Sequence, residues 1–268
     1  MKLLLSKFTE TKNIISSFAL FSMLLIMLGL TSCDKPGPEF FEQIFRGPEV
    51  TMGNGKANSF FKIISGSGTP LEIGFEMTKE ALTGLPQDPT NFAASTFILQ
   101  LDQTAKDLTP FEHLVINWQV HGHPPVDVFT VPHFDFHFYT ITLAEQLAIP
   151  PYTPASAAQF DLLPPAGFMP ASFKPDPGGI PRMGKHWVEG LPTSFSHLMV
   201  YGSYNGQVNF IEPMLTLAYL QAGTTTNISY AQPQNFAKAG KWYPTKYNIY
   251  KDTQTLKHYV TLSEFVKR

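Results

Sequence analysis

His133-Phe134-Asp135-Phe136-His137-Phe138-Tyr139 is the stretch that decides the expected fold, because polar and aromatic residues alternate along it. Side chains of a β-strand point alternately to opposite faces. His133, Asp135 and His137 would therefore share one face, and the three phenylalanines would share the other. The pattern predicts a strand with one face in a hydrophobic core and one face that carries polar chemistry.

Two further histidines, His121 and His123, stand shortly before this stretch with the same spacing of two residues. Four of the eight histidines of the chain thus fall within Trp118–Tyr139. We expect this range to span two neighbouring strands, which would gather four imidazoles and the Asp135 carboxylate. Imidazole and carboxylate are usual ligands of borderline divalent metals, so the pattern predicts a site for zinc, iron or manganese.

The dipeptide Asn205-Gly206 predicts a hairpin, because Asn-Gly is the preferred two-residue turn between antiparallel strands. The expected strands are Ser194–Tyr204 and Gln207–Leu217. A two-residue turn also fixes the register of the two strands. In that register His197 and Glu212 would be diagonal neighbours on the same face, within reach of a shared ion.

The chain offers more candidate ligands than one ion needs, since a site typically uses three or four. The expected direct ligands are His121, His123, His133 or His137, and Glu212. The alternative ligands, or the outer partners that orient the imidazole rings, are Asp135, His186 and His197. His113 and His258 have no clustered partner and are expected to be ordinary residues.

The first 33 residues have the pattern of a targeting segment. Three lysines come first, Phe18–Leu30 is almost wholly apolar, and Leu30-Thr31-Ser32-Cys33 ends the segment. This resembles the lipobox of bacterial lipoproteins, which implies a signal peptide over 1–32 and a lipidated Cys33. The alternatives are a plain transmembrane anchor and a signal peptide with an incidental cysteine.

The resemblance implies a protein on the extracytoplasmic side of the bacterial cell envelope, held to the membrane by its lipid. Residues 33–48 would then be a tether, within which Phe40, Phe41, Ile44 and Phe45 suggest a short helix docked on the domain. The remaining residues, 49–268, are expected to form a single domain.

The amino-acid composition excludes several classes of partner and site. The chain has 23 phenylalanines, 23 prolines and only 15% charged residues, with a net charge of −2, so a nucleic-acid partner is not expected. Cys33 is the single cysteine, which excludes disulfides and thiolate metal sites from the mature chain. No Gly-x-Ser-x-Gly elbow, phosphate-binding glycine loop or His-Glu-x-x-His motif occurs.

Short alternating segments separated by turn residues predict a mostly β fold, an antiparallel sandwich or barrel-like single domain. One helix is expected over Thr142–Leu147, ended by Pro150-Pro151. Pro150–Pro181 is rich in proline but too apolar to remain in water. We expect it to be a long ordered loop that serves as a lid or a substrate wall.

Two families share parts of this pattern. His121-Gly122-His123 followed much later by a glutamate is loosely similar to the metal-binding pattern of cupins. A closer resemblance is to a family of uncharacterised bacterial secreted proteins and lipoproteins. It rests on His121–Pro125, Pro132–Tyr139, Met183–Trp187 and Phe210–Met214. That family has no established activity, so the resemblance implies only that these residues act as a unit.

The sequence therefore predicts a lipid-anchored extracytoplasmic protein with a histidine and carboxylate metal site, and it leaves the presence of catalysis open. In an enzyme the metal would act as a Lewis acid or bind dioxygen, while Asp135 or a free histidine moves the proton. The alternative is a non-catalytic surface or binding lipoprotein, in which the histidines form a structural metal site or a polar network. A small-molecule ligand and an oligomer are compatible with both.

Overall fold

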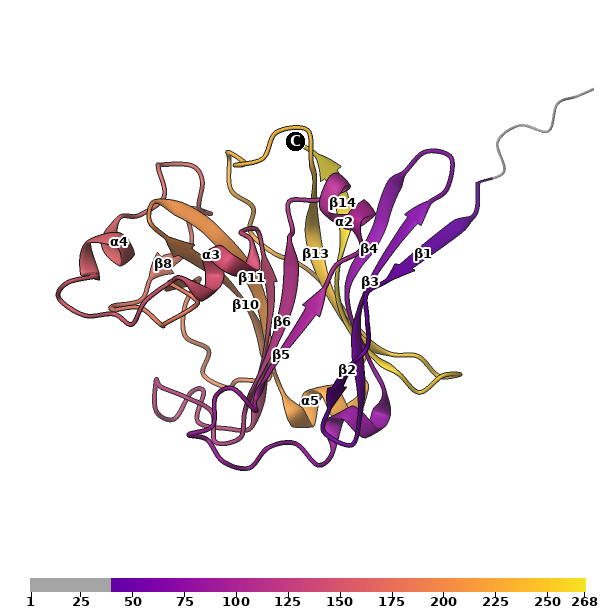
Figure 1. Ribbon diagram of the computed structural model, residues 1–268, viewed down its shortest axis with the longest axis horizontal. Coiled ribbons are helices and arrows are strands. Elements are labelled where there is room, and N and C mark those ends of the chain that lie inside the picture. Colours follow the sequence, from indigo (N-terminus) through magenta and orange to yellow (C-terminus); the bar gives the residue numbers. More distant parts are fainter. Residues whose placement is uncertain (1–39) are drawn as a thin grey trace, which may run out of the picture. The chain divides into compact units, whose positions relative to one another are not determined.

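Two antiparallel sheets of seven strands build the part of the chain that the structure describes, residues 40–268 of this computed structural model (Figure 1). The first sheet has the order β1-β3-β4-β14-β13-β12, with β2 beside β3. Its strands are β1 (Glu42–Arg46), β2 (Val50–Met52), β3 (Gly55–Ile64), β4 (Thr69–Met77), β12 (Thr226–Ser229), β13 (Trp242–Lys251) and β14 (His258–Lys267).

The second sheet has the order β5-β6-β7-β11-β10-β9-β8. Its strands are β5 (Thr96–Gln100), β6 (His113–Gln119), β7 (His133–Tyr139), β8 (Lys174–Pro175), β9 (Lys185–Val188), β10 (His197–Tyr204) and β11 (Gln207–Thr216). The sheets form a sandwich, and the described strands do not close into a barrel.

Helices are few and short in residues 40–268. They are the 3-10 helix η1 (Lys79–Leu82), α2 (Gln103–Leu108), α3 (Leu143–Leu147), α4 (Ala157–Asp161) and α5 (Leu217–Ala222). The predicted helix is α3, where Thr142 and Glu145 form a reciprocal capping box. No helix within this range has the length and apolarity needed to cross a membrane. Residues 40–268 form a unit of their own, which contains both sheets and their core.

Strand β7 confirms the alternation that the sequence predicts. Phe134, Phe136 and Phe138 are fully buried in the core between the sheets, and the ring of Phe75 on β4 packs edge-on against two of them. The opposite face of β7 carries the polar residues, yet every residue of this strand is buried. A further layer must therefore cover the outer face of the second sheet.

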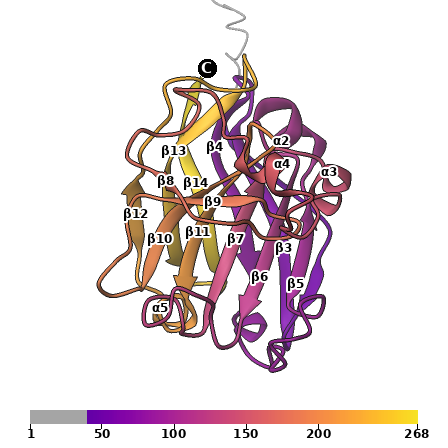
Figure 2. The ribbon, with the colours of Figure 1, turned by 90° about the vertical axis from the view of Figure 1, so that its left-hand side faces the viewer.

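The proline-rich segment and the residues after it provide that layer, and Figure 2 shows helix α4 of this segment in front of the second sheet. A second apolar cluster lies here, in which Met183 and Val188 pack against Val200, Phe210 and Met214 of the sheet. The segment contains α4 and β8 and is ordered, as expected.

The buried cation of Lys185 stabilises this layer. The Lys185 ammonium is almost fully buried and donates to the carbonyl oxygens of Asp176 and Gly178, at 3.1 and 2.9 Å. It also lies 3.0 Å from the carboxylate of Asp161 in α4. A buried charge is tolerated only when it is paired in this way, so Lys185 fixes the course of the loop.

The Asn205-Gly206 hairpin forms, but its register differs from the prediction. Ser203 pairs with Val208, whereas Gly202 pairs with Phe210, so Asn209 is an extra residue in β11. Such a bulge shifts the pairing by one and moves the remaining side chains to the other face. The predicted shared face of His197 and Glu212 is therefore wrong.

The amino-terminal region also differs from the prediction where it is described. Glu42–Arg46 is strand β1, paired antiparallel with β3, rather than a short docked helix. The predicted signal peptide, Cys33 and residues 34–39 lie outside the described residues.

Candidate metal centre

The first cluster combines the start of β7 with the loop that precedes it. His133 and Asp135 lie on the outer face of β7, and His123 reaches them from the loop between β6 and β7. His133 Nε2 is 3.2 Å from Asp135 Oδ1, and His123 Nε2 is 4.0 Å from Asp135 Oδ2. We call these three residues the pocket triad.

The loop turns back sharply to deliver His123. Gly122 has a φ of +68°, and an added Cβ would come within 1.8 Å of the carbonyl oxygen of Phe129. The backbone of His123 then donates to that same oxygen, at 3.2 Å. A side chain at position 122 would be strained twice, so glycine permits the tight return. The prediction that His123 lies on a strand is therefore wrong, because His123 belongs to the loop between β6 and β7.

Both imidazoles of the pocket triad are oriented by backbone carbonyls. His133 Nδ1 is 2.8 Å from the carbonyl oxygen of Val131, and His123 Nδ1 is 2.7 Å from that of Pro124. A carbonyl oxygen only accepts, so each Nδ1 carries the proton and donates it. Each Nε2 is then the ring nitrogen that faces Asp135 and can bind a metal. This is the arrangement that outer partners give to metal-binding histidines.

Asp135 is oriented as well, because the Gln119 amide donates to its Oδ2 at 3.1 Å. Burial raises the pKa of Asp135, but the charge of His133 outweighs burial and holds this pKa well below its usual range. Burial lowers the pKa of His133, and the Asp135 charge outweighs it, so the net shift is upward. Without metal the pocket triad is therefore an ion pair, in which a proton occupies the place of a cation.

The second cluster lies further along the same face. His137 on β7, Glu212 on β11 and His186 on β9 bring three ligand atoms within 4.8 Å of one another. Pairing of Phe210 with Tyr139 and of Met214 with Asp135 places Glu212 opposite His137. Glu212 Oε2 is 3.4 Å from His137 Nε2 and 3.6 Å from His186 Nε2. We call these residues the buried triad.

A glycine and an aromatic ring hold the buried triad in place. The ring of Phe210 lies against His137 and His186, with centroids 4.8 and 5.3 Å away. It also covers Gly202 of β10, where a Cβ would come within 2.0 Å of the ring. Any larger residue at position 202 would displace Phe210 and, with it, the two imidazoles.

The buried triad is neutral without a metal. Burial lowers the pKa of His137 to about 3 and that of His186 to about 4. Burial, with a further contribution from the Asp135 charge, raises the pKa of Glu212 well above its usual range. A cation bound here would have to displace the Glu212 proton.

Four separations between ligand atoms of the two triads are close to those that a metal requires, and the remaining ones lie within 4.8 Å. Ligands at about 2.1 Å from a tetrahedral ion lie about 3.4 Å apart, and the four measured contacts fall between 3.2 and 4.0 Å. Of the nine buried polar side-chain atoms that lack a hydrogen bond in residues 40–268, five belong to these triads. Unsatisfied buried atoms are costly, and a cation in each triad would satisfy all of these five except His137 Nδ1.

A cavity of about 570 Å³ opens over the pocket triad. His123, Asp135 and Gln119 line it, together with His186 of the buried triad. The other lining residues are mostly apolar, and residues 176–180 of the proline-rich segment form one wall. The proline-rich segment thus forms part of a cavity wall, and its role toward a substrate stays a prediction.

Several predicted site residues lie elsewhere. His121 is exposed and belongs to neither triad. His197 lies on the face toward the first sheet, and its Nδ1 is 2.9 Å from the Tyr247 hydroxyl. His113 is an ordinary buried residue, as predicted, with Nε2 2.9 Å from the Gln146 side chain.

Two polar residues of the site were not singled out from the sequence. Gln119 orients Asp135, and Asp176 lines the cavity with a carboxyl whose pKa is raised by burial. Gln119 pairs with His133 across β6 and β7, a neighbour relation that a correct strand register would have revealed. Asp176 lies in the proline-rich segment, which has no periodicity, so the sequence held no signal for it.

Compared with known protein families, with curated proteins and with solved structures, the chain matches none of them. The function must therefore be inferred from the geometry of the site itself.

Proposed function

We propose that this chain is a divalent-metal protein of the bacterial cell envelope whose metal is open to a small-molecule cavity. One observation carries the proposal. In the pocket triad, two Nε2 atoms and one carboxylate converge on a single point that faces a cavity, and each is oriented by an outer partner. Such outer partners are typical of metal sites rather than of simple polar networks.

The favoured role is catalysis on a small, largely apolar substrate. Three protein ligands leave one position of a tetrahedral zinc open, which distinguishes catalytic from structural sites. A metal held there would supply a Lewis acid that polarises a bound oxygen. The apolar cavity walls would orient the substrate and exclude water, and Asp176 is placed to accept or return a proton.

The buried triad supports a second, non-catalytic role. The side chains of His137 and Glu212 are at most 2% exposed and only His186 reaches the cavity, so an ion bound there would be less accessible to a substrate than one in the pocket triad. A closed ion that joins β7, β11 and β9 would stabilise the sheet. This is the structural metal site that the sequence analysis held as the alternative.

The first experiment measures metal content by mass spectrometry on the untagged soluble chain that begins at Asp34. We expect at least one equivalent of metal in the parent and a loss in a His133→Ala, His137→Ala double variant, which disables both triads. Circular dichroism checks that the variant is folded. A folded parent that takes up no metal after supplementation with zinc, iron or manganese would overturn the proposal.

X-ray absorption on the loaded protein then separates the two roles. Three protein ligands and one water are expected if the pocket triad holds the ion in an open site. A shell of protein atoms without water, with both oxygens of Glu212 bound in the buried triad, would favour the structural role.

The anchor is tested separately in a bacterial host. The lipobox-like Leu30-Thr31-Ser32-Cys33 supports lipidation at the cysteine. We expect the full chain in the membrane fraction with incorporated fatty-acid label, and a Cys33→Ser variant without label. Equal labelling of both chains would rule out Cys33 as the anchor.

A further inference from the structure

A second cavity, of about 490 Å³, lies away from the metal triads. Tyr201 and Ile211 line it from the core side of β10 and β11, whereas Val200 and Glu212 beside them face the triads. Tyr243 and Pro244 line it from β13 of the first sheet. The cavity therefore lies on the opposite face of the second sheet, and the proposed metal chemistry does not use it.

The walls of this cavity offer mainly apolar surface. Five prolines and three phenylalanines line it, with three tyrosines whose hydroxyls are occupied by the backbone. Tyr201 donates to the Ala231 carbonyl oxygen, Tyr230 to that of Pro244 and Tyr243 to that of Lys238. The tyrosines thus contribute ring surface to a ligand, which favours an apolar ligand body.

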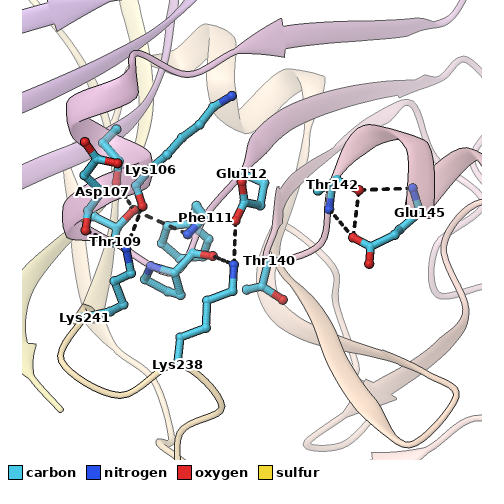
Figure 3. Close-up of polar contacts among 12 residues, drawn as sticks. Lys106, Asp107, Thr109, Phe111, Glu112, Thr140, Thr142, Glu145, Lys238 and Lys241 are labelled. Atoms are coloured by element: carbon cyan, nitrogen blue, oxygen red, sulfur yellow. Dashed lines mark hydrogen bonds and ion pairs between the residues drawn. The ribbon is translucent and has the colours of Figure 1, made fainter.

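Lys238 is the only charged side chain among the described residues that line the cavity. Its ammonium donates to Glu112 Oε1 at 2.7 Å and to the Pro110 carbonyl oxygen at 3.0 Å, as Figure 3 shows. An ammonium has three N–H donors, so one remains for a ligand. The two protein partners hold the Lys238 ammonium in place at the cavity wall.

A second cation lies near this wall. The Arg268 guanidinium lies 4.8 Å from the ring centre of Phe236, and that ring lines the cavity. An acidic head group would therefore meet the Lys238 ammonium at the wall, while the cavity interior favours an apolar group.

We propose that this cavity binds an amphipathic anion, a molecule with an apolar body and one acidic head group. The body lies among the prolines and aromatic rings, and the head accepts the free N–H of Lys238. This inference does not rest on the metal proposal, since the two sites share no residue.

Titration calorimetry on the chain from Asp34 provides the test, with dodecanoate below its micelle concentration as probe. Dodecanol supplies the same body without charge, and dodecyltrimethylammonium supplies the opposite charge. We expect dodecanoate to bind at least tenfold more tightly than either. A charge-assisted hydrogen bond corresponds to about a tenfold to hundredfold change, so Lys238→Met should weaken dodecanoate binding by that factor.

Lys241 provides a matched control in the same connection between strands. Its ammonium also donates to backbone carbonyl oxygens, those of Lys106 and Asp107 near the end of α2, but it does not line the cavity (Figure 3). Lys241→Met should therefore leave dodecanoate binding unchanged. Lys238→Arg keeps the charge and should retain most of the affinity, which separates loss of charge from loss of fold.

Three results would overturn the inference. They are absence of dodecanoate binding, equal binding of dodecanoate and dodecanol, and equal weakening by Lys238→Met and Lys241→Met. Binding should also persist in the His133→Ala, His137→Ala variant, and its loss there would place the probe in the metal cavity instead.

Discussion

Each triad combines two imidazoles with one carboxylate and includes residues from the outer face of β7, yet the surroundings of the two triads differ. Each member of the pocket triad has an outer partner, namely the Val131 carbonyl, the Pro124 carbonyl or the Gln119 amide. In the buried triad both ring nitrogens of His137 and one oxygen of Glu212 have no hydrogen bond. Ligand identity alone therefore does not prepare a metal site, because orientation and charge depend on the second layer of contacts.

The largest difference between the two triads is expected when one carboxylate is removed at a time. Asp135→Asn should lower the zinc affinity of the pocket triad at least a hundredfold, because the triad loses its only anionic ligand. Glu212→Gln should spare that site and empty the buried triad. Competition titration against a chelator, with metal content, measures both. Equal loss from the two variants would mean that the triads act as one site.

Sequence reasoning found β7 and most of both triads. The alternation along β7 placed His133, Asp135 and His137 on one face because a strand has a strict two-residue period, and the structure confirms this. Glu212 is predicted as a ligand because it would neighbour His197, and that reason is wrong. It lies in the site because it is opposite His137, a pairing between strands far apart in the sequence that no local turn reveals.

The bulge at Asn209 is the physical reason for the error over His197. A turn fixes register only as far as the strands remain regular, and one extra residue inverts every face beyond it. His123 shows the converse limit. The turn at Gly122 and the hydrogen bond to the Phe129 carbonyl oxygen position His123, and a two-residue strand period cannot predict a loop of this kind.

The packing of the buried triad can be tested at Gly202. Gly202→Ala should cost about 1–3 kcal/mol of unfolding free energy, because its Cβ would overlap the Phe210 ring. Since Phe210 contacts His137 and His186, the metal of the buried triad should be lost before that of the pocket triad. Urea unfolding and metal content measure the two effects.

Gly190→Ala is the matched control, since no atom lies within 4 Å of a Cβ at that position. It should change the unfolding free energy by less than about 0.5 kcal/mol. A similar cost at both glycines would contradict the proposed overlap.

The contribution of an outer partner can be tested at Gln119, which orients Asp135. Gln119→Ala should lower metal affinity in the pocket triad by about tenfold to a hundredfold, since outer partners of ligands have effects of that size. The buried triad should keep its metal affinity, because the Gln119 side chain donates its hydrogen bond to Asp135 and not to a residue of the buried triad. An unchanged affinity in Gln119→Ala would show that Asp135 needs no support.

The two carboxylates should affect the stability of the metal-free protein with opposite signs. The pKa of Asp135 is lowered in the folded state, so its contribution is present above the unfolded value near 4 and is lost as pH falls. Asp135→Asn should therefore destabilise the metal-free protein at pH 7. The pKa of Glu212 is raised in the folded state. The free energy of unfolding of the metal-free protein therefore falls as pH rises above about 4.5, where Glu212 of the unfolded chain loses its proton.

Glu212→Gln should consequently gain stability relative to the parent, by about 1 kcal/mol per pH unit as pH rises from 5. Thermal unfolding of the metal-free chains across pH 5–8 measures the trend. With saturating zinc the order should reverse, because only ionised Glu212 binds the ion. A parent and variant with parallel pH profiles would mean that Glu212 is already ionised without metal.

The smallest effect is expected at His197, and it tests the register itself. His197→Gln should leave metal content unchanged and cost about 1 kcal/mol, because the side chain contacts the Tyr247 hydroxyl and the Tyr219 ring on the other face of the sheet and no residue of either triad. His186→Gln is equally conservative but should lower metal content in the buried triad. If His197→Gln removed metal instead, the hairpin would have to pair without its bulge, with His197 and Glu212 on the same face of the second sheet.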